Sequence, residues 1–241
     1  MRIAIIAALP GELKPLVVGW HRKAGTPNGI ALWSKTVGGY EWLALCGGMG
    51  QAAALRSFAA AEAVGAVDLV ISAGIAGALE EQPKPGRCYQ PAEVVDALTG
   101  ERFSLAGGET DQRLVTTAIV ADQTEKQRLR NAYGATLVDM EAAAIARIAR
   151  TRNIPVYCFK AVSDGPSAQL PDLNRFIDPS GQMRMSAFVA YVLLRPRFWR
   201  SLVKLGLTSR RASVALARSI EEFLQENSKN TTVQELSKQS D

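Results

Sequence analysis

Residues 135–162 read ATLVDMEAAAIARIARTRNIPVYCFKAV, and this stretch carries the clearest signal for the fold. The short apolar run at 135–138 predicts a buried strand, and the Ala- and Ile-rich run at 141–152 predicts a helix. The run at 155–162 predicts a second buried strand. A strand, a helix and a strand with short connections indicate parallel strands joined by a right-handed crossover. The sequence therefore predicts an α/β protein with helices on both faces of its sheet.

The rest of the chain repeats this alternation of buried strands and helices. We expect one α/β domain at 1–178 with a central mixed, largely parallel sheet, a basic amphipathic helical extension at 179–226 and a flexible polar tail at 227–241. Further strands are predicted at 3–8, 30–36, 42–46, 67–73, 86–96 and 114–120, and further helices from Pro10 and at 49–64, 122–132, 183–194, 196–205 and 209–225.

Composition excludes several classes of protein. The 241 residues are 47% hydrophobic and carry 28 basic against 23 acidic side chains, which is typical of a globular chain. His21 is the only histidine, so catalytic devices that need two histidines, such as most zinc hydrolase sites, are excluded. We expect no metal and no cofactor, and acid–base chemistry would fall to carboxylates.

The cellular compartment follows from the cysteines and the apolar runs. The three cysteines are odd in number and form no CxxC pair, which favours a reduced, cytoplasmic compartment. The apolar run at 3–9 is short and stops at Pro10, so we expect a buried strand there rather than a signal peptide. No apolar stretch reaches the roughly 20 residues that a membrane-spanning helix needs.

Two glycine clusters follow predicted strands. Residues 48–53 match GxGxxA formally, but a dinucleotide site also expects an acid at the end of the next strand, where Ser72, Ala73 and Gly74 stand. The remaining interpretations are close approach of the backbone to a ligand and close packing at a helix N-terminus. The second cluster, at 74–77, indicates either a pocket or a tight turn after its strand.

Three carboxylates, Glu12, Glu141 and Asp164, each follow the end of a predicted strand. Each has an ordinary explanation, because acids are favoured in the first turn of a helix and Asp is favoured in turns. Ligands of open α/β sheets, however, bind outside the carboxyl ends of the strands. Carboxylates grouped at that edge suit chemistry with a cationic transition state and a protonated leaving group, as in glycosyl cleavage.

Five short segments have the order and spacing of the motifs of one known family. They are IAIIAA at 3–8 followed by Glu12, GMGQAAA at 48–54, SAGIAG at 72–77, VDMEA at 138–142 and AVSD at 161–164.

These segments resemble the nucleoside phosphorylase / methylthioadenosine–S-adenosylhomocysteine nucleosidase superfamily, over residues 1–178. LNRF at 173–176 and LRPRFW at 194–199 resemble its hopanoid-associated nucleosidase (phosphorylase) branch. The resemblance implies a nucleoside phosphorylase-like fold, a small-molecule nucleoside as substrate, and cleavage of the N-ribosidic bond to a purine. It also implies a homodimer.

The resemblance assigns roles to single residues. Asp164 matches the general acid that protonates the purine at N7. Glu141 matches the carboxylate that holds the ribose hydroxyls, and Glu12 matches the residue that orients the attacking water. Substrate contacts are implied for Met140, Ser163, Gly74, Ile75, Met49, Ile119 and Phe176.

Two positions depart from the phosphorylases of this superfamily, which bind phosphate with an arginine and a serine where this chain has Ser72 and Ile75. An apolar side chain cannot compensate the desolvation of a phosphate dianion, so hydrolysis is favoured over phosphorolysis. We expect a 5′-modified adenosine as substrate, adenosylhopane first, with release of adenine. A methylthioadenosine/S-adenosylhomocysteine nucleosidase, a phosphate-dependent phosphorylase and a binding protein without activity remain alternatives.

The stretch 179–220 contains eight Lys or Arg and no acid, so it holds a charge of +8 against −3 for the rest of the chain. Helical spacing places Arg197, Arg200 and Lys204 on one face with apolar side chains on another. A nucleic acid, an anionic membrane surface and a solvated helix face all fit this pattern. We expect no nucleic acid; Arg195–Arg218 is predicted either to contact the inner membrane surface or to pack on the core.

Overall fold

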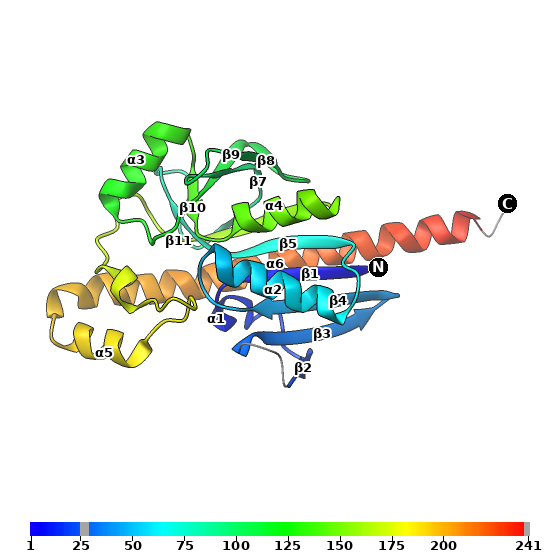
Figure 1. Cartoon of the computed structure of the whole chain (residues 1–241), viewed down its shortest axis with the longest axis horizontal. Coiled ribbons are helices and arrows are strands. Elements are labelled where there is room, and N and C mark those ends of the chain that lie inside the picture. The colour runs from blue at the N-terminus through cyan, green and yellow to red at the C-terminus, as the bar shows by residue number, and fades with distance from the viewer. Residues whose placement is uncertain (25–28, 239–241) are drawn as a thin grey trace.

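The structure is a computed structural model that describes residues 1–24 and 29–238, with side chains described as far as Asn227. Within these residues the chain forms a mixed sheet with helices on both faces (Figure 1), which confirms the predicted fold class. The strands are β1 (Arg2–Ala7), β2 (His21–Lys23), β3 (Ala31–Val37), β4 (Tyr40–Cys46), β5 (Leu69–Ala78), β6 (Cys88–Tyr89), β7 (Pro91–Asp96), β8 (Arg102–Ser104), β9 (Glu109–Thr116), β10 (Leu137–Asp139) and β11 (Val156–Asp164). The helices are α1 (Pro10–Leu13), α2 (Gln51–Val64), α3 (Gln123–Tyr133), α4 (Ala142–Arg152), α5 (Met185–Leu193) and α6 (Trp199–Lys238), with 3₁₀ helices η2 (Leu173–Phe176) and η3 (Pro196–Phe198).

Strand β1 shows why its sequence is apolar at every position. Alternate side chains of a strand point to opposite faces of the sheet. Ile3 and Ile5 enter the core cluster that contains Leu216 of α6, whereas Ala4 and Ile6 enter the cluster that contains Phe58 of α2. Both faces of β1 are therefore covered, as predicted for a central strand of an α/β sheet.

Strand β5 is the long central strand around which the sheet is organised. Its first residues pair parallel with β1, its last two pair antiparallel with β10, and β11 runs parallel along residues 70–77. The predicted strand ends at residue 73, followed by a glycine turn at 74–77. That prediction is wrong, because these residues continue the strand, and Gly74 adopts φ +142°, a conformation that favours glycine.

The predicted parallel neighbours at 135–138 and 155–162 do not pair with each other. Strand β10 pairs antiparallel with β5 and parallel with β9, while β11 lies on the other edge of β5. Strand β5 thus lies between the two strands. The local spacing of strand, helix and strand in the sequence cannot show that a third strand lies between them.

Smaller differences concern the edges of the sheet. Strands β2 and β8 were not predicted, because a strand of three residues at the edge of a sheet is too short to show an apolar pattern. The predicted strand at 86–96 divides into β6 and β7, which pair with different strands.

After α5 and η3, the last part of the C-terminal extension is one long helix rather than two. Residues 199–238 form α6, whereas the sequence predicts helices at 196–205 and 209–225. Part of the predicted tail at 227–241 lies in this helix, and residues 239–241 lie outside the described residues. Figure 1 shows α6 crossing one side of the sheet, with its start extending to α5; we call residues 199–211 the first half of α6 and residues 212–224, which pack on the sheet, its second half. No helix in the described ranges has the length and apolar character needed to cross a membrane.

Candidate active site

Glu12 is held at the carboxyl end of β1 by the backbone. Its Oε2 accepts hydrogen bonds from the N–H groups of Ala8 (3.0 Å) and Leu9 (3.1 Å), so the carboxylate folds back over the start of α1. Burial raises the pKa of Glu12, while these N–H groups and the charge of Lys160 act against the rise. A Cβ at Gly74 would lie 3.3 Å from this carboxylate, so glycine at this position allows β5 to pass close to Glu12.

Glu141 is held between two helix N-termini. It precedes the first residue of α4, and its Oε1 accepts a hydrogen bond from the N–H of Gly50 (2.7 Å) at the start of α2. Burial and the neighbouring charge of Asp139 raise the pKa of Glu141 to about 7, although Lys160 and the Gly50 N–H act in the opposite direction. The glycine turn at 48–50 thus binds a carboxylate of the protein itself, and Glu12 is close enough to contribute to the same pKa.

A buried ion pair lies beneath these two carboxylates. Lys160 Nζ lies 2.8 Å from Asp139 Oδ2, and both side chains are almost completely buried. Burial alone would lower the pKa of Lys160, but the negative charge of Asp139, with smaller contributions from Cys158 and Glu141, raises it. The lysine therefore stays charged and stabilises the acidic cluster.

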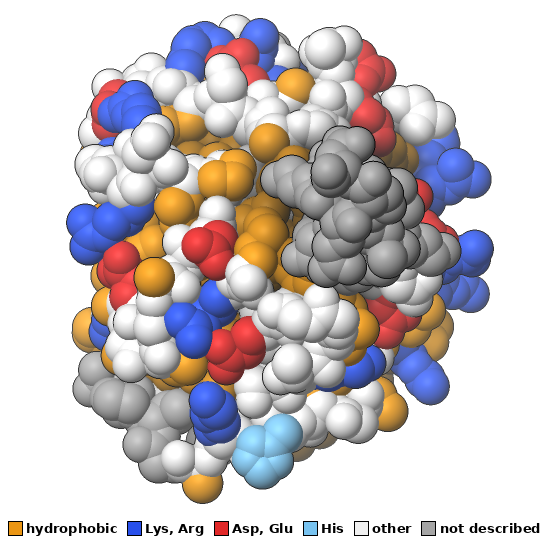
Figure 2. Space-filling view, turned by 90° about the vertical axis from the view of Figure 1, so that its right-hand side faces the viewer, with side chains coloured by type: hydrophobic (Ala, Val, Ile, Leu, Met, Phe, Trp, Pro, Cys, Tyr) orange, Lys and Arg blue, Asp and Glu red, His pale blue; other side chains and the backbone are white. Residues whose placement is uncertain are grey.

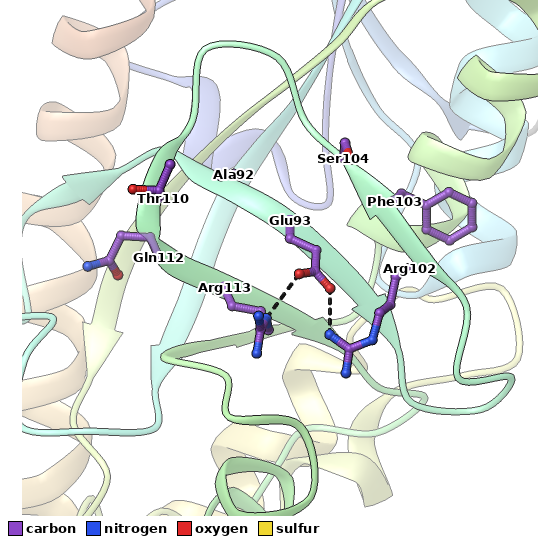
Figure 3. A pocket seen from close by; sticks show the side chains of 8 residues that line it. All are labelled: Ala92, Glu93, Arg102, Phe103, Ser104, Thr110, Gln112 and Arg113. Atoms are coloured by element: carbon purple, nitrogen blue, oxygen red, sulfur yellow. Dashed lines mark hydrogen bonds and ion pairs between the residues drawn. The ribbon is translucent and has the colours of Figure 1, made fainter.

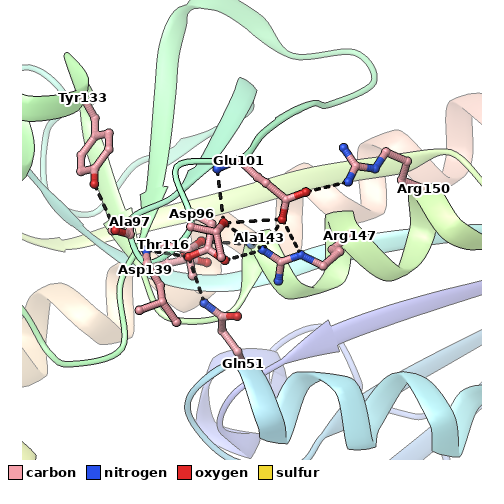
Figure 4. Close-up of polar contacts among 12 residues, drawn as sticks. Gln51, Asp96, Ala97, Glu101, Thr116, Tyr133, Asp139, Ala143, Arg147 and Arg150 are labelled. Atoms are coloured by element: carbon pink, nitrogen blue, oxygen red, sulfur yellow. Dashed lines mark hydrogen bonds and ion pairs between the residues drawn. The ribbon is translucent and has the colours of Figure 1, made fainter.

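Asp139 also fixes the turn that presents Met140 and Glu141. It accepts hydrogen bonds from the Thr116 hydroxyl (2.6 Å) and from the N–H of Ala142 (2.9 Å). Figure 4 shows this group beside a second network, in which Arg147 of α4 binds Asp96 and Glu101. The N-terminus of α4 is thereby anchored to the end of β9 through Thr116, and the middle of α4 is anchored to the end of β7 through Arg147.

Asp164 lies in a different environment, at the end of β11. A register shift between Val162 and Asp164, which is a β-bulge, precedes it. Bulges re-aim side chains and are frequent next to active sites. The Asp164 carboxylate accepts hydrogen bonds from Ser163 Oγ and from Lys126 Nζ, and the same Nζ donates to the carbonyl of Gly165 (2.8 Å).

Asp164 faces a cavity of about 480 Å³. Its walls come from the segments at 81–85 and 163–170 and from the first half of α6. Asp164 pairs in register with Gly77, three residues along β5 from Gly74, which adjoins Glu12, a separation of about 10 Å along an extended strand. No hydrogen bond or ion pair in the described part of the chain joins Asp164 to the other two acids.

The remaining predicted substrate contacts are divided between these places. Met49 and Met140 adjoin the Glu141 end, because Met49 precedes Gly50, whose N–H binds Glu141, and the N–H of Met140 donates to the Glu141 carboxylate (3.2 Å). Ile75 lies beside Glu12 in β5. Ile119 is half exposed, whereas Phe176 is buried against Phe188 and Tyr191 of α5.

Three residues of the site were missed by the sequence analysis. Lys160 stands alone in the apolar run VYCFKAV, and a charge in a buried strand signals a buried partner. Asp139 lies within the motif VDMEA at 138–142, but no role was assigned to it from the sequence. Lys126 gives no local signal, because one lysine on a polar helix is ordinary.

A second hollow, of about 400 Å³, lies over the edge strands β7, β8 and β9. Figure 3 shows Glu93 in this hollow bridging Arg102 (2.6 Å) and Arg113 (3.2 Å). Among the described residues that line this hollow, Glu93 is the single acid and balances only one of the two arginine charges, and none of the three predicted catalytic carboxylates lines it.

The comparisons with known proteins agree with this architecture. The sequence model of the phosphorylase superfamily matches residues 2–115 and 113–193. A search of curated proteins finds no match.

Solved structures share the fold over almost the whole chain. A 5′-methylthioadenosine/S-adenosylhomocysteine nucleosidase from Helicobacter pylori is 13% identical with a TM-score of 0.70, covering 94% of this chain and 98% of its own. The futalosine hydrolase of Helicobacter pylori is 13% identical with a TM-score of 0.71 and the same coverage. The 5′-methylthioadenosine nucleosidase of Arabidopsis thaliana is 18% identical with a TM-score of 0.72, covering 93% of this chain and 94% of its own.

Proposed function

The chain belongs to the phosphorylase superfamily, and from this premise we propose that it hydrolyses the N-ribosidic bond of a 5′-modified adenosine. The observation that carries the proposal is Asp164, hydrogen-bonded by Ser163 and Lys126 at the wall of a cavity. A carboxyl group in this position can give a proton to a leaving base, while the two other carboxylates lie near the carboxyl ends of β1 and β10.

The proposed reaction divides the work among the three acids. Asp164, which lies in an ion pair with Lys126, takes up a proton from Lys126 Nζ or from water and passes it to N7 of the purine, which makes the base a better leaving group as the C–N bond breaks. Positive charge then develops on the ribose, and carboxylates nearby stabilise it. Glu141 accepts hydrogen bonds from the ribose 2′- and 3′-hydroxyls, with Met140 against the sugar. Glu12 orients the water that attacks the anomeric carbon.

We prefer hydrolysis to phosphorolysis because the residues at positions 72 and 75 offer no positive charge that could bind phosphate. Ser72 is wholly buried in β5, and position 75 is an isoleucine. The nearby cation, Lys160, is already paired with Asp139. A phosphate dianion bound here would lose its hydration without compensation.

Adenosylhopane is the substrate that we place first, with release of adenine. The cavity at Asp164 is lined on one side by Lys204, Leu205 and Thr208 of α6, and these are neighbours of exposed apolar side chains. A large lipid at C5′ fits such surroundings, and a cytoplasmic enzyme would then work at the inner membrane surface. A homodimer is part of the proposal. A methylthioadenosine/S-adenosylhomocysteine nucleosidase is the alternative, supported by the names of the Helicobacter and Arabidopsis structures.

The test is adenine release from a panel of adenosines that differ only at C5′: unmodified, methylthio, homocysteinyl and hopanyl. Each is assayed with and without phosphate. We expect phosphate-independent release that is fastest with the hopanyl substrate. Strict dependence on phosphate would refute hydrolysis, a preference for the methylthio compound would select the alternative, and no release from any substrate would refute the proposal.

A further inference from the structure

An apolar surface covers the outer side of the C-terminal helices. Helix α5 has the sequence MSAFVAYVL but buries none of its side chains fully. Helices that are apolar on all sides are ordinarily buried, and large exposed apolar patches mark interaction sites. The C-terminal apolar face, as we name it, consists of side chains that are 47–80% exposed: Met185, Val189, Leu193, Leu194, Trp199, Val203 and Leu207.

The C-terminal apolar face is exposed, whereas the opposite side of α5 packs against the rest of the protein. Phe188 and Tyr191 of α5 pack edge-on against the buried Phe176. Trp199 donates its indole N–H to the carbonyl of Val192 (2.8 Å), which satisfies the polar group but leaves the ring about half exposed. Tryptophan in this state, with a satisfied N–H and an open ring, suits a boundary between water and apolar material.

The charges around the face have one sign. No acid occurs between Asp178 and Glu221. In the described part of the chain no ion pair with a carboxylate engages the basic residues that border the face. By contrast, the opposite end of the molecule mixes acidic and basic side chains (Figure 2). The basic residues that lie between members of the face in the sequence are Arg195, Arg197, Arg200 and Lys204.

This charge pattern distinguishes among the molecules or surfaces that could bind the C-terminal apolar face. A second copy bound through the same face would bring two sets of cations together with no acid to separate them. A nucleic acid would satisfy the cations but leave the apolar side chains in water. An anionic bilayer satisfies both, because basic side chains contact lipid phosphates while apolar ones enter the headgroup boundary.

We propose that the C-terminal apolar face docks onto the surface of an anionic lipid bilayer. The contact is centred on α5, η3 and the first half of α6, which adds α5 to the segment Arg195–Arg218 expected from sequence and omits its later part. Residues 212–224 of α6 instead pack on the sheet through Ala212, Leu216 and Ile220.

Docking would bring the cavity at Asp164 to the membrane. Ser201, Lys204 and Thr208 line the cavity and lie on the same half of α6 as Trp199 and Val203. A nucleoside anchored by a lipid at C5′ could then reach Asp164 while its lipid stays in the bilayer. This last step rests on the proposed function; the docking itself does not.

The test is co-sedimentation of the full chain with vesicles of phosphatidylcholine alone or mixed with phosphatidylglycerol. We expect at least tenfold tighter binding to the anionic vesicles, weakened by salt. Val203→Ser with Leu207→Ser should reduce binding at least tenfold. The matched control is Val214→Ser, because Val214 is an equally exposed apolar residue of α6 in the half that packs on the sheet; it should bind as wild type.

Equal binding to neutral and anionic vesicles, or undiminished binding by the double variant, would overturn the proposal. So would a dimer that the double variant dissociates, or preferential binding of duplex DNA. Adenine release from soluble 5′-methylthioadenosine, measured on the same samples without vesicles, reports the proposed function separately. Activity without vesicle binding would refute the docking alone, and vesicle binding without activity on any nucleoside would refute the function alone.

Discussion

The acidic cluster in the sheet and the apolar face of the C-terminal helices reverse the usual placement of side chains in opposite ways. Around Glu12 and Glu141 charged groups are buried, whereas on α5 and the first half of α6 large apolar groups face water. The buried charges have partners within the protein, because Lys160 and backbone N–H groups compensate them. The apolar face has no such partner in the described part of the chain. Buried charges that have partners within the protein indicate a site for chemistry or binding in the protein itself. Exposed apolar side chains without such partners indicate contact with another molecule or surface.

The sharpest way to test this separation is Asp164→Asn. Removing a general acid typically lowers kcat by 10²- to 10⁴-fold, and we expect a loss of about 10³-fold in adenine release. Vesicle binding should be unchanged if the two regions work independently. The change also leaves Lys126 buried without its carboxylate, so a loss of stability is expected.

A double variant separates chemistry from stability at this position. Asp164→Asn with Lys126→Met removes the unpaired charge, so it should regain thermal stability relative to Asp164→Asn but remain inactive. Adenine release near the wild-type rate from either variant would contradict the assignment of Asp164.

Helix α6 allows the comparison to be made within one element. Leu216→Ala should lower the free energy of unfolding by about 3 kcal/mol, because Leu216 is fully buried in the core. Leu207→Ala, nine residues earlier on the exposed half, should change it by less than about 0.5 kcal/mol. Urea denaturation of both variants measures the difference. A large loss from Leu207→Ala would mean that the apolar face is covered by the protein itself.

The pH dependence of activity tests the buried end of the site. Glu141 must be ionised to accept hydrogen bonds from two hydroxyls, and its pKa is raised to about 7 by burial and by Asp139. We expect kcat/KM to fall about tenfold per pH unit below pH 7, and Glu141→Gln to have low activity without this dependence. A flat profile for the wild-type protein between pH 5 and 7 would contradict the role of Glu141.

The same pKa has a consequence for stability. Since the pKa of Glu141 is higher in the folded protein than in the unfolded chain, the group stabilises the fold at low pH, and that contribution is lost as the pH rises through about 7. The difference in stability between Glu141→Gln and the wild-type protein should therefore shift in favour of the variant when the pH rises from 5 to 8. Thermal unfolding of both proteins at the two pH values measures this shift.

Local sequence was a good guide wherever neighbours along the chain carry the information. The apolar run of β1 predicted a strand covered on both faces, and Glu12 and Glu141 follow β1 and β10 as predicted, whereas Asp164, which was predicted to follow its strand, is the last residue of β11. Local sequence failed as a guide where pairing with strands distant in the sequence decides the conformation. The glycines at 74–77 continue β5 instead of forming a turn, because β10 and β11 pair with them there.

The sequence by itself determined the fold class, the three acids and the excess of basic charge in the extension, since composition and period are properties of the chain alone. Only the tertiary structure decided which charges meet. Lys160 reaches Asp139 because β11 lies beside β5, and Lys126 reaches Asp164 because α3 packs near the bulged end of β11. It also decided that one half of α6 is buried and the other exposed. Burial depends on what lies opposite a helix face, and that is set by segments far away in the sequence.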